Sequence, residues 1–443
     1  MVLVVACLYC LNRFTSETIW KFDLTTGGDI YPDTKDFGYN ITSPVIVDDM
    51  IAINSATSHD SGGKTVMGFY LLDRMTGELI DHEEILHSPP LDEFGTIVWD
   101  GRTFVNGGST PSYDSGALYF GTSDGRILAY SASRENGLEL LWECVPPSDV
   151  DSEGKYIGCR GSIYYYSPTI VDVDGVRTLF IGNYDGYILA VDASTGELLW
   201  NKRLISLYEK NKSLKGTPGC VDLITYIGDN RLVAVCKDGS MSPSMGLTVC
   251  IDTRTGKGSG DSDYYWIYDG LFQGTVPVEG GFIAYADAAN YPSVEGPGVK
   301  SIKDEGVYRM DVNGEVVWRV DSHYIGSRMT TAAGLVYMSE YSAGMFDDGG
   351  HIIAKRISDG STVWSIKLEP YSSDSYCMAA PTVVDGKIYT ANDYGAVYCI
   401  SEIQGKQWDG GGEIILPNGF WHWSWALLIA VAAIAVIALI KYY

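Results

Sequence analysis

The chain has 443 residues, 46% of them hydrophobic and 20% charged, which supplies a packed core and excludes a globally disordered chain. It carries 56 Asp and Glu against 31 Lys and Arg, a formal net charge of −25. Such a surface repels phosphate backbones, so we expect no nucleic-acid partner. The 51 glycines and 31 tyrosines favour many short strands joined by tight turns.

The first residues, 1–14, read MVLVVACLYCLNRF and are mostly apolar. They resemble the end of a signal peptide but lack a basic stretch, and Val4–Cys7 loosely fits a lipoprotein cleavage box. A mis-assigned start codon is an equal alternative. We expect residues 1–14 to be a signal-peptide remnant outside the folded domain.

A repeated unit dominates the middle of the chain and is clearest at Ser167–Leu204. Four short apolar runs are separated there by turn signals at Asp174–Gly175, Asp185–Gly186 and Thr195–Gly196, and such turns join the strands of a hairpin. Related units recur at 43–80, 117–142, 231–266, 281–318, 334–364 and 380–402. A fourth-strand pattern at Glu17–Leu24 has no unit before it.

Six tryptophans that end these units lie 44 to 66 residues apart, a spacing typical of a four-stranded blade with variable loops. We therefore predict an all-β fold, a β-propeller of about seven four-stranded antiparallel blades over residues 15–408. Because a single blade cannot bury both of its faces, the blades must stack around an axis. We expect Glu17–Leu24 to close the ring as the fourth strand of the last blade.

The pattern at Val191–Trp200, VDASTGELLW, resembles the repeat of the pyrroloquinoline-quinone-like (PQQ-like) family, and Leu72–Gly77 and Ile251–Gly256 share its first half. In that family the Thr-Gly turn joins the third and fourth strands, and the tryptophan docks between neighbouring blades. The resemblance assigns this structural role to Trp20, Trp142, Trp200, Trp266, Trp318, Trp364 and Trp408.

Quinone-dependent alcohol dehydrogenases of this family carry an adjacent Cys-Cys pair beside the cofactor and a calcium ion held by Glu and Asn. This sequence has no Cys-Cys pair, and no catalytic or metal-ligand set stands out. We expect no catalytic residues and no cofactor, with PQQ and calcium as the alternative. Asp172–Gly175 faintly resembles a calcium loop but is better explained as a hairpin turn.

The nine cysteines contain no CxxC pair and no zinc-site spacing. Cys144 and Cys159 flank one loop and are the best candidates for a disulfide. The equal alternative is that the cysteines are free, buried and act as small hydrophobic residues.

Long loops are concentrated in the second-to-third connections and the blade-to-blade connections, which lie on one face of a propeller. Loops on a rigid scaffold are the usual place for binding, and exposed tyrosines favour recognition of proteins or sugars. The predicted partner-binding face consists of Tyr164, Tyr165, Tyr291, Tyr341, Asp347, Asp348 and Tyr371.

Residues 420–440, FWHWSWALLIAVAAIAVIALI, contain no charged residue. At about 1.5 Å per residue a helix of this length spans about 30 Å, the thickness of a bilayer core. Three tryptophans stand at one end and Lys441 at the other. We predict one transmembrane helix over 420–440, with a Gly-rich linker at 409–419 and a cytoplasmic stub at 441–443.

These features predict a single-pass cell-membrane protein with an extracellular propeller that acts as a protein-binding or assembly scaffold. Similar repeats occur in the lipoprotein component of the outer-membrane barrel-assembly machinery, a scaffold without chemistry. The alternatives are a PQQ-dependent oxidoreductase and a receptor for a sugar or cell-wall polymer.

Overall fold

The structure is a computed structural model. It describes residues 7–13, 15–24, 42–58, 65–87, 98–99, 102–103, 108–122, 124–147, 158–161, 163, 167–204, 220–237, 246–286, 298–302, 304–322, 328–341, 350–367, 380–391, 397–401 and 436–437. Within these ranges all regular structure is β-strand.

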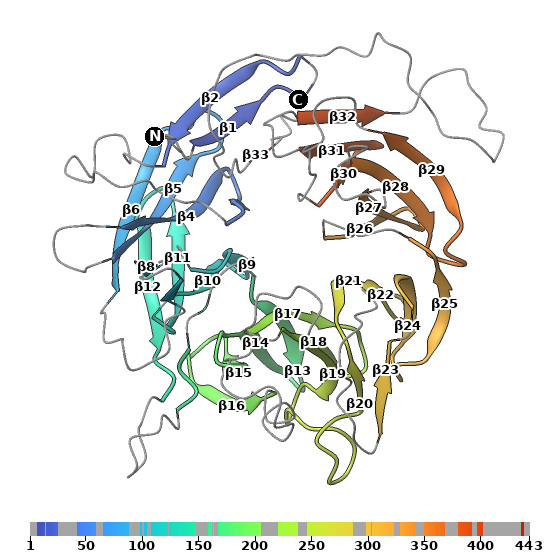
Figure 1. The fold of residues 1–443 in the computed structure, drawn as a ribbon. Coiled ribbons are helices and arrows are strands. Elements are labelled where there is room, and N and C mark those ends of the chain that lie inside the picture. The colour runs from blue at the N-terminus through green and yellow to red at the C-terminus, as the bar shows by residue number, and fades with distance from the viewer. Residues whose placement is uncertain are drawn as a thin grey trace.

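Eight sheets of three to five strands follow one another around a ring, and we number them as blades in chain order (Figure 1). Blade 1 contains β1 (Cys7–Leu11), β2 (Thr18–Asp23) and β33 (Val436–Ile437). Blade 2 contains β3 (Val45–Val47), β4 (Met50–Ser58), β5 (Thr65–Asp73) and β6 (Leu79–His87). Blade 3 contains β9 (Ser112–Asp114), β10 (Ala117–Gly121), β11 (Ile127–Ser133) and β12 (Gly137–Cys144). Blade 4 contains β13 (Thr169–Val173), β14 (Val176–Gly182), β15 (Tyr187–Asp192) and β16 (Leu198–Arg203).

The second half of the ring repeats this order. Blade 5 contains β17 (Cys220–Tyr226), β18 (Arg231–Lys237), β19 (Gly246–Asp252), β20 (Trp266–Asp269) and a fifth, parallel strand, β23 (Val299–Ser301). Blade 6 contains β21 (Phe272–Val278), β22 (Gly281–Ala286), β24 (Gly306–Asp311) and β25 (Val316–Val320). Blade 7 contains β26 (Thr330–Ala332), β27 (Leu335–Tyr341), β28 (Gly350–Arg356) and β29 (Thr362–Lys367). Blade 8 contains β30 (Thr382–Val384), β31 (Lys387–Ala391) and β32 (Val397–Ser401), and a separate hairpin joins β7 (Val98–Trp99) to β8 (Arg102–Thr103).

The hydrophobic core lies between blades rather than within them. One cluster joins Phe180 and Ile188 of blade 4 to Leu232 and Val249 of blade 5. Corresponding clusters join all the remaining pairs of consecutive blades from blade 1 to blade 8. Burial of apolar surface therefore requires neighbours on both sides, which is the reason that the repeats assemble into a ring.

The first blade corrects the predicted closure. Glu17–Leu24 was expected to complete the last blade, but β2 pairs with β1, an antiparallel strand formed by Cys7–Leu11. Leu8 is fully buried and packs with Tyr70 of blade 2, so these residues belong to the propeller rather than to a leader outside it. Among the described residues the ring therefore contains eight sheets, where the repeat predicted about seven blades, because β1 and β2 belong to a sheet of their own.

The ring closes through a contact between its first and last sheets. The Arg13 guanidinium, beside the β1–β2 turn, binds the carboxylate of Asp385 in the β30–β31 turn at 2.7 Å. Figure 1 shows β2 and β32 on either side of the junction where the two ends of the ring meet.

The predicted transmembrane helix falls almost entirely outside the described residues. Its two described residues, Val436 and Ile437, form β33, which runs parallel to β1. Within the part of the chain that the structure describes, no helix has the length and apolar character needed to cross a bilayer.

Candidate functional site

Five tryptophans connect neighbouring blades by one repeated geometry. Four lie on the outermost strand of their blade, and Trp266 lies on β20, which β23 flanks. Each donates its Nε1–H to a backbone carbonyl in the turn after the third strand of the next blade, at 2.9–3.1 Å. Each ring also lies against the glycine of that turn. The pairs are Trp20 with Arg74, Trp142 with Ala193, Trp200 with Thr253, Trp266 with Val312 and Trp318 with Ile357. Trp20 and Trp266 are buried and the other three are half-buried, and indoles with a paired N–H in such surroundings suit this structural role.

The remaining two repeat tryptophans are less informative. Trp364 is half-buried, with its ring centroid 6.0 Å from that of Tyr337. Trp408 lies outside the described residues.

Blade 2 departs from the repeat at the tryptophan position. In blade 4 the tryptophan, Trp200, lies four residues after the turn glycine, Gly196. In blade 2 the residue four positions after the corresponding Gly77 is Asp81. Its carboxylate accepts the backbone N–H of Leu138 in blade 3 at 2.7 Å. The sequence reasoning missed this substitution, although aligning the two Thr-Gly turns reveals it.

One face of the ring carries the second-to-third turns and the blade-to-blade segments, and we call it the connection face. The N–H of Ile163, between blades 3 and 4, bonds to the carbonyl of Thr122 in the β10–β11 turn at 3.0 Å. The N–H of Val221, at the start of blade 5, bonds in the same way to Asn183 in the β14–β15 turn, also at 3.0 Å. These bonds place both classes of connection together, as the strand order predicts.

The opposite face carries the remaining hairpin turns, and we call it the turn face. Arg134 of blade 3 forms ion pairs there with Asp49 and Asp73 of blade 2. Arg177 of blade 4 binds Asp114 of blade 3 at 2.5 Å. The turn face therefore uses these charged groups to join neighbouring blades.

All but one of the predicted partner-binding residues are on segments that the structure does not describe. Tyr341 ends β27, with its side chain outside the described residues. Those wholly outside the described ranges are Tyr164, Tyr165, Tyr291, Asp347, Asp348 and Tyr371. Their grouping on one face stays a prediction.

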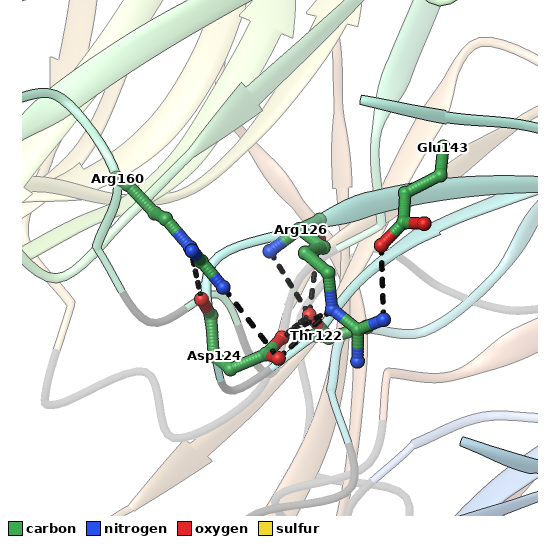
Figure 2. Close-up of polar contacts among 5 residues, drawn as sticks. All are labelled: Thr122, Asp124, Arg126, Glu143 and Arg160. Atoms are coloured by element: carbon green, nitrogen blue, oxygen red, sulfur yellow. Dashed lines mark hydrogen bonds and ion pairs between the residues drawn. The ribbon is translucent and has the colours of Figure 1, made fainter. Parts of the chain in front are cut away.

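The described part of the connection face contains a charged cluster in blade 3 (Figure 2). The side chain of Asp124 is only 3% exposed, and Arg126 Nε donates to both of its oxygens, at 3.0 and 2.8 Å. Arg160 Nε donates to the Asp124 backbone carbonyl at 2.8 Å, and Arg126 also binds the more exposed Glu143 at 2.9 Å. A buried carboxylate that is paired in this way is electrostatically satisfied.

The equivalent carboxylate in blade 4 has a different environment. Asp185 lies two residues after Asn183 in the β14–β15 turn, just as Asp124 lies two residues after Thr122. The position that Arg126 occupies in blade 3 is taken by Tyr187 in blade 4. Its Oδ2 is buried and accepts no hydrogen bond. Burial raises the pKa of Asp185 from 3.8 to about 6, and the charge of Arg203 opposes that shift only in part.

Cys144 and Cys159 are close enough to interact but are free thiols in the structure. Both are buried in the cluster between blades 3 and 4. Burial raises the pKa of each thiol to about 11, so neither is a thiolate at neutral pH. The predicted disulfide is not formed here, and the pairing stays a prediction.

No group of three or more His, Cys, Asp or Glu side chains in the described ranges is arranged to hold a metal ion. In the Asp172–Gly175 turn, Asp172 Oδ1 accepts the N–H of Gly175 at 2.9 Å. Asp174 and Gly175 have φ values of 52° and 89°, as a tight hairpin turn requires. The turn geometry thus accounts for these residues.

The fold and the blade-to-blade tryptophans define a PQQ-like repeat propeller. The family model described as "Outer membrane protein assembly factor BamB" matches residues 2–217, 90–294 and 169–422, so the matches together extend over most of the chain. The chain belongs to this family. A comparison with curated proteins found no match.

The chain also resembles solved structures at low sequence identity. BamB from Moraxella catarrhalis is 14% identical, with 84% of this chain and 99% of that chain covered and a TM-score of 0.46. A europium-containing methanol dehydrogenase is 14% identical, with 81% and 78% covered and a TM-score of 0.46. Sqt1 from Saccharomyces cerevisiae is 11% identical, with 82% and 95% covered and a TM-score of 0.47.

Proposed function

We propose that this protein is an assembly scaffold without catalysis, which binds a protein partner on its connection face. The membership of the BamB family carries the proposal, because the description of that family is of an assembly factor. The two faces of the ring support the choice of surface. The turn face uses Arg134 and Arg177 for contacts between blades, whereas the connection face presents Glu143 and the half-buried Asp185.

The scaffold is held on the outside of a cell membrane by a single helix at 420–440. The support is the uncharged 21-residue sequence with tryptophans at one end and Lys441 at the other. Residues 441–443 would then lie on the cytoplasmic side. The net charge of −25 of the whole chain favours a partner with a complementary basic surface.

The protein works without PQQ or calcium. The sequence has no adjacent Cys-Cys pair, which the resemblance associates with the quinone site. Titration of the purified chain with PQQ and calcium should give no saturable change in quinone absorbance. A tight, calcium-dependent complex would instead support the oxidoreductase alternative.

Site-specific photo-crosslinking in native membranes tests the proposed face. A photo-reactive residue replaces Glu143, whose side chain is 36% exposed on the connection face. The matched position is Met75, which is 38% exposed in a hairpin turn of the turn face. We expect a discrete protein adduct from position 143 and none from position 75. Adducts from position 75 alone would contradict the choice of face, and capture of a polysaccharide would favour the receptor alternative.

A further inference from the structure

The turn between β1 and β2 has the same backbone geometry as the turns that receive the blade-to-blade tryptophans. The N–H of Ser16 bonds to the carbonyl of Asn12 at 2.8 Å, and the N–H of Asn12 bonds to the carbonyl of Glu17 at 2.8 Å. In blade 4, Gly196 and Asp192 make the same two bonds. Ser16 of blade 1 therefore occupies the position of the turn glycine against which an indole ring lies in other blades.

A serine at this position does not accommodate an indole in that geometry. A Cβ atom on any of the five turn glycines would lie between 2.5 and 2.9 Å from the docked ring, well inside the optimal contact distance of carbon atoms. Ser16 has a φ of 60°, close to the 64° to 77° of these glycines, so its Cβ points to the same place. The glycines are buried or half-buried, whereas Ser16 is exposed. They are Gly77, Gly196, Gly256, Gly314 and Gly360.

The side chains of blade 8 that point toward blade 1 are open to solvent. Tyr398 and Ile400 pack on blade 7, so the alternate residues of β32 face the other way. Of these, Val397 is 40% exposed, and Cys399 is also exposed. The corresponding third strand of blade 5, β19, is buried along its whole length. Blade 8 is therefore not packed on blade 1 in the way that consecutive blades pack elsewhere.

Polar groups face blade 8 from the other side of the same boundary. Leu8, Cys10 and Phe22 pack on blade 2, so Tyr9 and Lys21 point toward blade 8. Lys21 is exposed, with its ammonium 5.6 Å from the centre of the Tyr9 ring. No hydrophobic cluster of described residues joins blades 8 and 1, whereas such clusters join the seven boundaries from blade 1 to blade 8.

An ion pair crosses this boundary on the turn face. The Arg13 guanidinium binds the Asp385 carboxylate at 2.7 Å, and the Asp385 side chain is 47% exposed. An ion pair that is so accessible to water is weak and is screened by salt. We propose that the ring opens at the boundary between blades 8 and 1, with the Arg13–Asp385 pair as its latch. The apolar clusters keep the other boundaries together, and the opening does not depend on the proposed partner-binding function.

Double electron–electron resonance on the full-length, detergent-solubilised protein tests the proposal. One pair of spin labels replaces Thr18 in blade 1 and Thr382 in blade 8, which are both exposed. A control pair replaces the exposed Glu135 in blade 3 and Thr195 in blade 4, across a boundary that the Trp142 indole joins. The labels are attached through a non-natural amino acid, so that the native cysteines stay unchanged. We expect a second, longer distance across the boundary of blades 8 and 1, and a single distance across the control boundary.

Two variants of the latch set the size of the effect. Arg13→Gln removes the charge and should raise the population of the longer distance about two- to fivefold, whereas Arg13→Lys keeps the charge and should raise it less. Raising NaCl from about 0.05 M to about 0.5 M should increase this population in the wild type and not in Arg13→Gln. Arg177→Gln is the matched control, because it breaks the Arg177–Asp114 pair at the boundary that Trp142 also joins. It should leave the distance of the control label pair unchanged.

Three results overturn the proposal. A single distance across the boundary of blades 8 and 1, in both the wild type and Arg13→Gln, would show that the ring is packed there. Equal responses of the two label pairs to loss of their arginine would show that this boundary is no different from the others. A larger population of the longer distance in Trp408→Phe would show that an indole closes the boundary despite Ser16. The salt dependence of the wild type decides the question if Arg13→Gln does not fold.

Discussion

The indole of Trp200 in blade 4 donates its Nε1–H to the carbonyl of Thr253 in blade 5 at 3.0 Å, and its ring lies against Gly256 of the same turn. Trp200→Phe keeps most of the ring and leaves this carbonyl without its donor, so we expect a loss of about 1 kcal/mol of stability. Trp200→Ala also removes the ring and should cost about 3 kcal/mol. Chemical unfolding of the purified chain measures both.

The neighbouring Leu199 provides the control for this series, since its side chain is 43% exposed on the same strand. Leu199→Ala should change the stability by less than about 0.5 kcal/mol. Hydrogen exchange at Thr253–Gly256 should accelerate in Trp200→Ala and stay unchanged in Leu199→Ala. Equal effects of the two substitutions would show that the tryptophan does not join the blades energetically.

Asp81 performs the blade-to-blade role in blade 2 by a different chemistry. The Leu138 N–H donates to Asp81 Oδ2 at 2.7 Å, and Asp81→Ala leaves this N–H without an acceptor. We therefore expect the free energy of unfolding to fall by about 1–3 kcal/mol. Asp81→Asn retains an acceptor oxygen and should lose less. The exchange rate of the Leu138 amide separates the two variants, and an unchanged rate in Asp81→Ala would contradict the assigned role.

The repeat made much of the fold predictable. Turn residues such as Asp174–Gly175 and the position of Trp200 occur at fixed offsets, and their physical requirements are local. The extra strand β1 was not predictable in the same way. Five mainly apolar residues near a chain end fit a leader as well as a strand, and only packing against Tyr70 of blade 2 distinguishes them.

The candidate site was only partly accessible to sequence reasoning. The connection face follows from strand order alone. Asp185 was read as half of an Asp-Gly turn, which is correct, but the consequence of having Tyr187 instead of Arg126 appears only when two blades are compared. Burial of the Asp185 oxygen depends on Gly161 from the preceding connection, and no local pattern encodes such a long-range contact.

Asp185 should give the stability of the folded protein a specific pH dependence. Its pKa rises from 3.8 to about 6 on folding, so the folded protein binds more protons than the unfolded chain between these values. Its contribution therefore favours folding at low pH and is lost as the pH rises through about 6, a change of roughly 2–3 kcal/mol. Asp185→Asn should remove this component, and the difference in thermal midpoint between variant and wild type should be larger at pH 7.5 than at pH 4.5. An equal difference at both pH values would contradict the shifted pKa.

Residues 420–440 have two possible structural roles, and one truncation distinguishes between them. If they form a transmembrane anchor, a chain that ends at Asn418 should be released from membranes by a salt wash and should keep the thermal midpoint of the full-length protein. If Val436–Ile437 instead completes blade 1 as a parallel neighbour of β1, the truncation exposes the edge of β1 at Tyr9–Cys10 and should lower the midpoint. We expect release without destabilisation, because the Arg13–Asp385 ion pair and the packing of Leu8 on blade 2 do not involve the deleted residues. Fractionation and thermal unfolding of the two chains measure both quantities, and a truncated chain that stays with the membrane would exclude the anchor.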